Sequence, residues 1–136
     1  MTEMITDESA AARVVSDKVA YIRLSREGIA GSFARDIVSH GGKEAASQAL
    51  HTQPRQLSRY YQRKSLSPKD SEAMLDTLKT VALAQQVWGK AEAVDRWMNQ
   101  EVPALAHERP VELMDTFVGR QWIRDVLNKI KAGDFS

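Results

Sequence analysis

Apolar residues recur at helical spacing along most of this chain, and glycine and proline punctuate the pattern. In the N-terminal part, Val15, Val19 and Ile22 fall on one side of a predicted helix over residues 8–26, which should stop at Gly28. No sustained strand alternation bounded by turn residues is present. The pattern therefore predicts an all-α fold.

The longest predicted helix starts at Pro68, where Ser67 is the expected N-cap, and ends at Gly89. Shorter helices are predicted over residues 90–100 and 111–117, and Gly119 should precede the last one. The expected buried side of that last helix consists of Trp122, Ile123, Val126, Leu127 and Ile130.

Between these regions the sequence predicts a helix-turn-helix. Residues 43–50 are rich in alanine and helical, residues 51–53 form a tight connection, and Pro54 opens a second helix that runs to about Lys64. We therefore divide the chain into an N-terminal helical region, residues 1–66, with the helix-turn-helix at about 42–64, and a C-terminal domain, residues 67–136.

Composition excludes several classes of protein. The 136 residues are 43% hydrophobic and 27% charged, which is typical of a globular domain, and the formal net charge is only +1. No cysteine is present, so disulfides and thiol chemistry are excluded. No apolar run approaches the roughly 18–20 residues of a membrane span, and the acidic N-terminus does not resemble a secretory signal. We expect a cytoplasmic protein that does not contact a membrane.

The nearly neutral total hides a local basic patch. Residues 43–69 carry six basic side chains and one acidic side chain. Arg55, Arg59 and Arg63 are spaced four apart, which places them on one face of a regular helix, where arginine can contact bases or phosphates. The candidate DNA-binding residues are Lys43, Arg55, Gln56, Ser58, Arg59, Arg63 and Lys64. A solvated basic face without a partner, or a dimer interface, would explain the same pattern.

Catalytic and metal-binding patterns are absent from the sequence. The three histidines lie in different predicted turns without a metal-ligand spacing, and no nucleophile elbow or phosphate-binding glycine loop is present. We predict that the chain is not an enzyme and requires no cofactor or metal.

From Leu66 onward an ordered series of motifs characterises the chain. The series is Leu66-Ser67-Pro68, Trp88-Gly89, Ala93, Trp97, Arg109-Pro110, Leu113, Thr116, Gly119, Ile130 and Gly133. It resembles the Xre/MbcA/ParS toxin-binding antitoxin domain. One departure is Ala106-His107-Glu108, at a position where family members often have a leucine-glycine-glycine turn.

The resemblance implies an antitoxin of a type II toxin–antitoxin system that neutralises a RES-domain toxin acting on NAD, either by degrading it or by ADP-ribosylation. It also implies a homodimer that forms a hetero-oligomer with the toxin and binds the operator DNA of its own operon. The family's C-terminal region blocks the toxin's NAD site. Carried onto this chain, the implied toxin-binding residues are Arg120, Arg124, Lys131, Gly133, Asp134 and Phe135.

Two alternatives remain open from the sequence. One is a stand-alone helix-turn-helix transcriptional regulator whose C-terminal half only dimerises. The other is a small-ligand sensor that uses the lobe containing Trp88, Trp97 and Trp122, although these side chains are more typical of a packed core, with at least one possible interface anchor.

Overall fold

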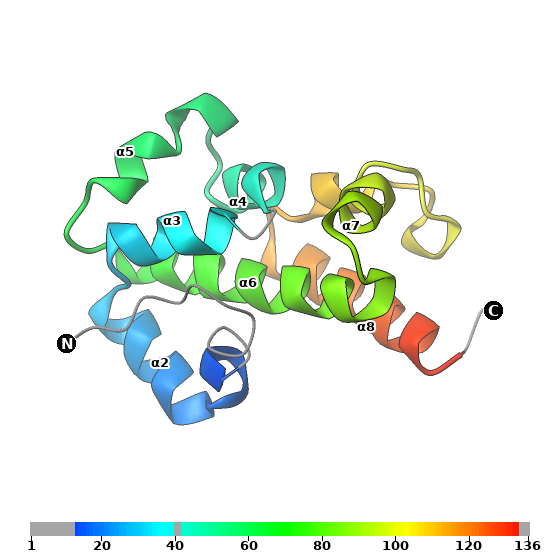
Figure 1. Cartoon of the computed structure of the whole chain (residues 1–136), viewed down its shortest axis with the longest axis horizontal. Helices are drawn as coiled ribbons and strands as arrows, with labels where there is room; N and C mark the ends of the chain where they lie inside the picture. The colour runs from blue at the N-terminus through cyan, green and yellow to red at the C-terminus, as the bar shows by residue number, and fades with distance from the viewer. Residues whose placement is uncertain (1–12, 40–41, 134–136) are drawn as a thin grey trace.

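A computed structural model describes residues 13–39 and 42–133 of the chain, and these ranges form an assembly of helices (Figure 1). Within them no strand occurs, and Val102 and Glu108 form an isolated β-bridge. The all-α prediction is confirmed. The elements are α2 (Lys18–Glu27), α3 (Gly31–Ser39), α4 (Lys43–Ala49), η1 (Pro54–Gln56), α5 (Ser58–Tyr61), α6 (Pro68–Trp88), α7 (Ala91–Met98), η2 (Pro103–Leu105), η3 (Pro110–Leu113) and α8 (Phe117–Lys131).

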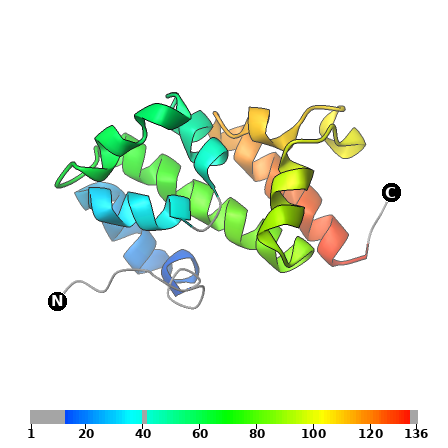
Figure 2. The same ribbon diagram turned by 45° about the horizontal axis from the view of Figure 1, so that its top comes forward.

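Helix α6 is the axis that both halves of the molecule share. Its first half, with Met74, Leu75 and Leu78, packs in an apolar cluster with α3, α4 and the residues around α5. Its second half, with Val81 and Ala84, belongs to another cluster formed with α7, η2, η3 and α8. Figures 1 and 2 show α6 running through the centre, with the two groups of helices arranged along it.

The N-terminal helix is shorter than the sequence predicts. We expected one helix over residues 8–26, and residues 8–12 lie outside the described ranges, but the helical residues 13–16 are separated from α2 at Asp17. Asp17 has an extended backbone, and its carboxylate accepts a hydrogen bond from the Ala20 N–H. An aspartate that caps a new helix therefore interrupts the predicted one. The predicted stop at Gly28 is confirmed.

The segment expected as one helix from Pro54 to about Lys64 is instead two short helical pieces. A 3-10 turn, η1, is followed by the four-residue helix α5. The backbone bonds Leu57 N–H to Pro54 O and Tyr60 N–H to Leu57 O both span three residues. The chain then leaves this path, because the Leu66 N–H donates to the Ile29 carbonyl at 2.8 Å. The prediction of a single regular second helix is wrong.

Helix α8 packs against α6 and begins three residues earlier than predicted, at Phe117 instead of after Gly119. Thr116 is its N-cap and accepts a hydrogen bond from the Gly119 N–H. Gly119 thus lies inside the helix, where a Cβ atom would overlap the carbonyl oxygen of Leu113. Glycine therefore allows the first turn of α8 to rest on the backbone of η3. Trp122, expected on the buried side of this helix, is 38% exposed.

The described ranges contain no helix that is both long and apolar enough to span a bilayer. They also hold no cluster of three or more histidine, aspartate or glutamate side chains placed to bind a metal ion.

Candidate functional site

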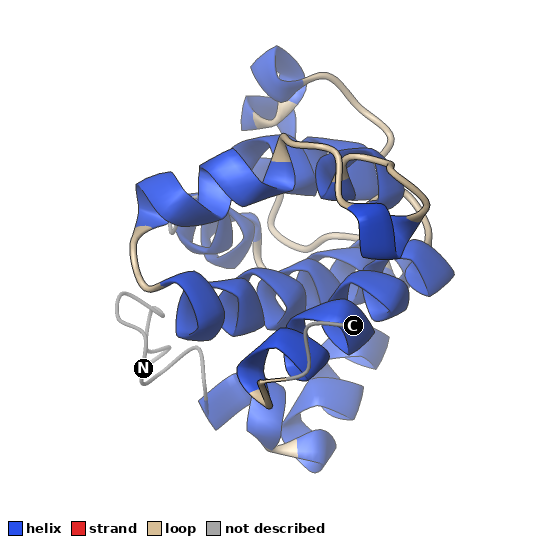
Figure 3. Ribbon diagram, turned by 90° about the vertical axis from the view of Figure 1, so that its right-hand side faces the viewer, coloured by secondary structure: helices blue, strands red, loops and turns tan. Residues whose placement is uncertain are grey.

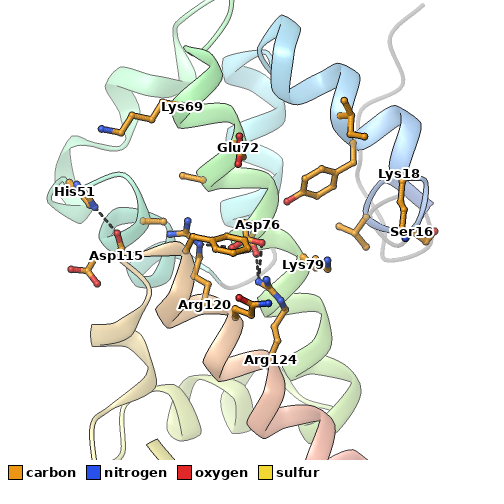
Figure 4. Close-up of a pocket in the computed structure, with 17 residues that line it drawn as sticks. Ser16, Lys18, His51, Lys69, Glu72, Asp76, Lys79, Asp115, Arg120 and Arg124 are labelled. Atoms are coloured by element: carbon orange, nitrogen blue, oxygen red, sulfur yellow. Dashed lines mark hydrogen bonds and ion pairs between the residues drawn. The ribbon is translucent and has the colours of Figure 1, made fainter.

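A buried cluster of three charged side chains joins the two long helices. Asp76 on α6 is 3% exposed, and Arg120 and Arg124 on α8 are 6% and 8% exposed. Arg120 Nε lies 2.7 Å from Asp76 Oδ2, and Arg124 Nη1 lies 3.0 Å from Asp76 Oδ1. One carboxylate thus accepts from two guanidinium groups, which point toward it from the neighbouring helix (Figure 4).

Helical periodicity explains how the cluster forms. Arg120 and Arg124 are four residues apart and so lie on one face of α8, as Asp76 and Thr80 do on α6. Arg124 Nη1 also donates to Thr80 Oγ1 at 2.7 Å, and Arg120 Nη1 donates to the Met114 carbonyl at 2.7 Å. The buried charges are therefore both paired and hydrogen-bonded, as charges away from water must be.

A cavity of about 830 Å³ opens beside this cluster, between α2, α6 and the start of α8. Tyr21 of α2 lines it, and burial, followed by the nearby Asp76 carboxylate, raises the pKa of the Tyr21 hydroxyl well above its usual range. Tyr21 is therefore a neutral hydrogen-bonding group near neutral pH. Lys79 of α6 and Phe117 of α8 also line the cavity.

The structure places the implied toxin-binding residues in two different settings. Arg120 and Arg124 are buried against Asp76 and hold α8 on α6. Lys131 is exposed, with Nζ 2.8 Å from Gln86 Oε1, and Gly133 is exposed with φ of +83° just after α8 ends. Asp134 and Phe135 lie outside the described residues. The toxin-binding role of all six residues stays a prediction.

The candidate DNA-binding residues lie on α4, η1, α5 and the residues that follow α5. Most are exposed, whereas Gln56 is half-buried and its Oε1 accepts from Thr52 Oγ1 at 3.1 Å. Because η1 has three residues per turn, a four-residue spacing rotates by about 120° there, and Arg55 and Arg59 need not share a face. The exposed members are Lys43, Arg55, Ser58, Arg59, Arg63 and Lys64.

Arg63 differs from the other arginines because it has partners within the chain. Its guanidinium carbon lies 4.5 Å from the centroid of the Tyr60 ring, and Nη1 lies 3.9 Å from Asp70 Oδ2. This geometry holds Arg63 against the start of α6. Arg55 and Arg59 have no ion pair with the described residues, so they present freer cations.

A contact between the two halves involves a residue that the sequence did not single out for function. His51, in the predicted turn of the helix-turn-helix, has a left-handed backbone with φ of +56°, and its Nε2 lies 2.7 Å from the Asp115 carbonyl oxygen. The same region borders a polar hollow of about 640 Å³ that Arg109 also lines. The basic region and the segment before α8 are therefore joined at this histidine.

Sequence reasoning missed Asp76, which is the shared acceptor of the cluster. Its signal was a lone carboxylate within the apolar pattern of α6, flanked by the buried Leu75 and Thr77. Such a residue is rarely buried unless it is paired, so it points to a basic partner. Periodicity alone does not identify that partner.

The second half of the molecule is a small helical domain made of the end of α6, α7, two 3-10 turns and α8, which share one apolar cluster. Residues 83–133 match the family model of the antitoxin Xre/MbcA/ParS C-terminal toxin-binding domain. This segment is similar to that toxin-binding domain, and the resemblance seen in the sequence is confirmed. This antitoxin domain family is not an enzyme family. No curated protein matches the chain.

Proposed function

We propose that this chain is a cytoplasmic antitoxin of a type II toxin–antitoxin system that binds and neutralises a RES-domain toxin. The toxin would act on NAD, by degrading it or by transferring ADP-ribose. The observation that carries the proposal is the match of residues 83–133 to the toxin-binding domain, which includes all of α7 and α8. The antitoxin has no catalytic role in this proposal.

The position at which α8 ends supports neutralisation by the C-terminal region. In Figure 1 the last turn of α8 lies at one edge of the molecule, far from α3 and α5, and in Figure 3 this end of the molecule faces the viewer. Lys131 and Gly133 are exposed there, and a carboxylate and an aromatic residue, Asp134 and Phe135, follow in the sequence. A cation, an acid and an aromatic ring in a short segment can occupy a pocket that is shaped for a nucleotide. Arg120 and Arg124 serve this contact by fixing α8 on α6.

The outer surface of α8 supports a protein partner. Val118 is 70% exposed and Trp122 is 38% exposed, although both side chains are large and apolar. Aromatic side chains are enriched at protein interfaces, where their burial contributes much of the binding energy. We assign this side of α8 to the toxin contact, in addition to the C-terminal end of the helix.

Autoregulation through operator DNA is the second part of the proposal. The exposed basic side chains of residues 43–64 support it, with Arg55 and Arg59 as the freest cations. The antitoxin would act as a homodimer and would form a hetero-oligomer with the toxin. Exposed Val19 and Ile22 on α2 support contact with a second copy, because both are large apolar side chains facing solvent.

Co-expression with the product of the adjacent reading frame tests the proposal. We expect a stable complex in affinity pull-down, and cellular NAD that falls only when this chain is absent. A Trp122→Ser and Val118→Ser double variant should weaken the complex, whereas the paired control Gln121→Ser and Asp125→Ser, on exposed positions of the same helix, should not. If the neighbour neither binds nor alters NAD, the antitoxin proposal fails and the stand-alone regulator is favoured.

A further inference from the structure

The cavity between α2, α6 and α8 has the dimensions of a small-molecule site. Its volume of about 830 Å³ lies within the roughly 300–1,000 Å³ typical of ligand pockets. Its wall combines the buried cluster with apolar and aromatic side chains from three separate helices. Figure 4 shows that Glu72, Asp76 and Lys79 come from α6 and that Arg120 and Arg124 come from α8.

The charge that lines this cavity is positive. Five cationic side chains and three carboxylates border it, which gives a net charge of about +2. The buried part of the wall has an excess of its own, because Asp76 neutralises only one of the two guanidinium groups. A buried charge without a counterion is costly. An anion that enters the cavity would therefore be stabilised at this position.

Arg120 and Arg124 still have N–H groups that can donate hydrogen bonds to such an anion. A guanidinium group has five N–H bonds, but Arg120 donates only through Nε and Nη1, and Arg124 only through Nη1, to acceptors in the described part of the chain. The fully enclosed side-chain atoms without a partner in that part belong to Asp36 and Trp88. Arg120 Nη2 and the Nε and Nη2 atoms of Arg124 are not among these enclosed atoms, so they border accessible space, and both residues line the cavity.

An apolar wall lies next to these donors. The Phe117 ring centroid is 6.0 Å from the Arg124 guanidinium carbon, and the side chain is 52% exposed. Tyr21 and Ile22 of α2 face the same cavity. We propose that this cavity binds a free small organic anion, whose phosphate or carboxylate lies on Arg120 and Arg124 and whose apolar body lies against the rings of Phe117 and Tyr21. Lys79 at the rim attracts the anion.

Calorimetric titration of the full chain at constant ionic strength tests this site, with phenyl phosphate and inorganic phosphate as probes. Phenyl phosphate supplies both the anionic head and an apolar body, and should bind one per chain with a Kd of about 1 mM or tighter. Inorganic phosphate supplies only the head, so it should bind about tenfold more weakly and compete for the same site.

Three variants of exposed residues locate the site without disturbing the core. Phe117→Ala should weaken the binding of phenyl phosphate about fivefold or more and leave the binding of inorganic phosphate unchanged, because only the apolar body of the probe touches that ring. Lys79→Gln should weaken the binding of both probes. Lys129→Gln changes an exposed lysine of α8 outside the cavity and should leave the binding of both unchanged.

Two results would overturn the proposal. The first is the lack of saturable binding of phenyl phosphate to the chain, as expected if only a carboxylate of a partner protein entered the cavity. The second is that Lys79→Gln and Lys129→Gln weaken the binding of phenyl phosphate equally, which would mean that the probe binds through the overall charge of the chain and not at this cavity. Both results are read on the isolated chain, so neither depends on the toxin.

Discussion

Asp76 and Arg120 lie 44 positions apart in the sequence, yet Arg120 Nε donates to Asp76 Oδ2 at 2.7 Å in a site where both side chains are buried. This ion pair connects the helix shared by both apolar clusters to the helix that ends near the C-terminus. Arg124 adds a second bond to the same carboxylate. The orientation of α8 on α6 therefore depends strongly on one acidic residue.

Replacing Asp76 with alanine should lower the free energy of unfolding by about 3–5 kcal/mol, because two buried guanidinium groups would lose their shared counterion. Urea unfolding followed by circular dichroism measures this loss. Asp125→Ala removes an exposed carboxylate from α8 and is the matched control, with an expected change within about 0.5 kcal/mol. Equal stability of the Asp76 and Asp125 variants would contradict the assigned role.

The sequence predicted the helices that have strong boundary signals. Ser67 and Pro68 define the start of α6, and Ser67 accepts a hydrogen bond from the Asp70 N–H as its cap. Gly89 defines its end with a positive φ of +84°. Such signals are local, so a single sequence is sufficient to read them.

Features that depend on tertiary contacts were not predicted. Pro54, at the expected first position of a helix, indicated one helix to about Lys64, but the pairing of Leu66 with Ile29 redirects the chain. The periodicity of α8 assigned Trp122 to its buried side, whereas the structure leaves it 38% exposed and places Arg120 and Arg124 in the buried site. Apolar spacing cannot reveal that two buried cations share a carboxylate on another helix.

Tyr21 should make the stability of the fold sensitive to alkaline pH. Its pKa is raised above the ordinary value of 10.0, first by burial and then by Asp76, so the folded state keeps the hydroxyl proton longer than the unfolded state does. This contribution to stability is fully present below pH 10 and is lost as pH rises further. Tyr21→Phe should therefore lose less stability than the parent between about pH 10 and 11, as measured by urea unfolding. Parallel pH curves for the two proteins would contradict this expectation.

The loop before η3 should be stabilised by glycine. Ala106 and His107 have φ angles of +57° and +64°, in the left-handed region that glycine favours. Ala106→Gly should raise the free energy of unfolding by about 0.5–1 kcal/mol, since relief of the strain outweighs the greater freedom of the unfolded chain. Thermal unfolding measures the gain. The control Ala104→Gly, at an exposed position of η2, should instead be neutral or destabilising, and a gain of equal size there would refute the explanation.

The three arginines of the basic region should contribute unequally to DNA binding. Arg55→Ala or Arg59→Ala should each lower the salt slope of binding to the operon's promoter fragment by about one if the side chain contacts a phosphate, or cost about 1–3 kcal/mol if it reads a base. Arg63→Ala should have a smaller effect, because that guanidinium is already held by Tyr60 and Asp70. Fluorescence anisotropy at several salt concentrations separates these cases. Unchanged affinity and slope in all three variants would remove this surface from the DNA-binding proposal.

Removal of the residues after Ala132 should separate neutralisation from folding. Gly133 is exposed, and a Cβ placed there would meet no atom within 4 Å, so the truncation deletes no packing contact at that position. We expect an unchanged thermal midpoint and toxin neutralisation weakened about tenfold or more. A full-length chain with Asp134→Ser and Phe135→Ser keeps the length of the tail but removes its carboxylate and its aromatic ring. If this variant loses neutralisation as the truncated chain does, the carboxylate and the ring are what the toxin binds. Full protection of cellular NAD by the truncated chain would instead assign the blockade to the body of α8.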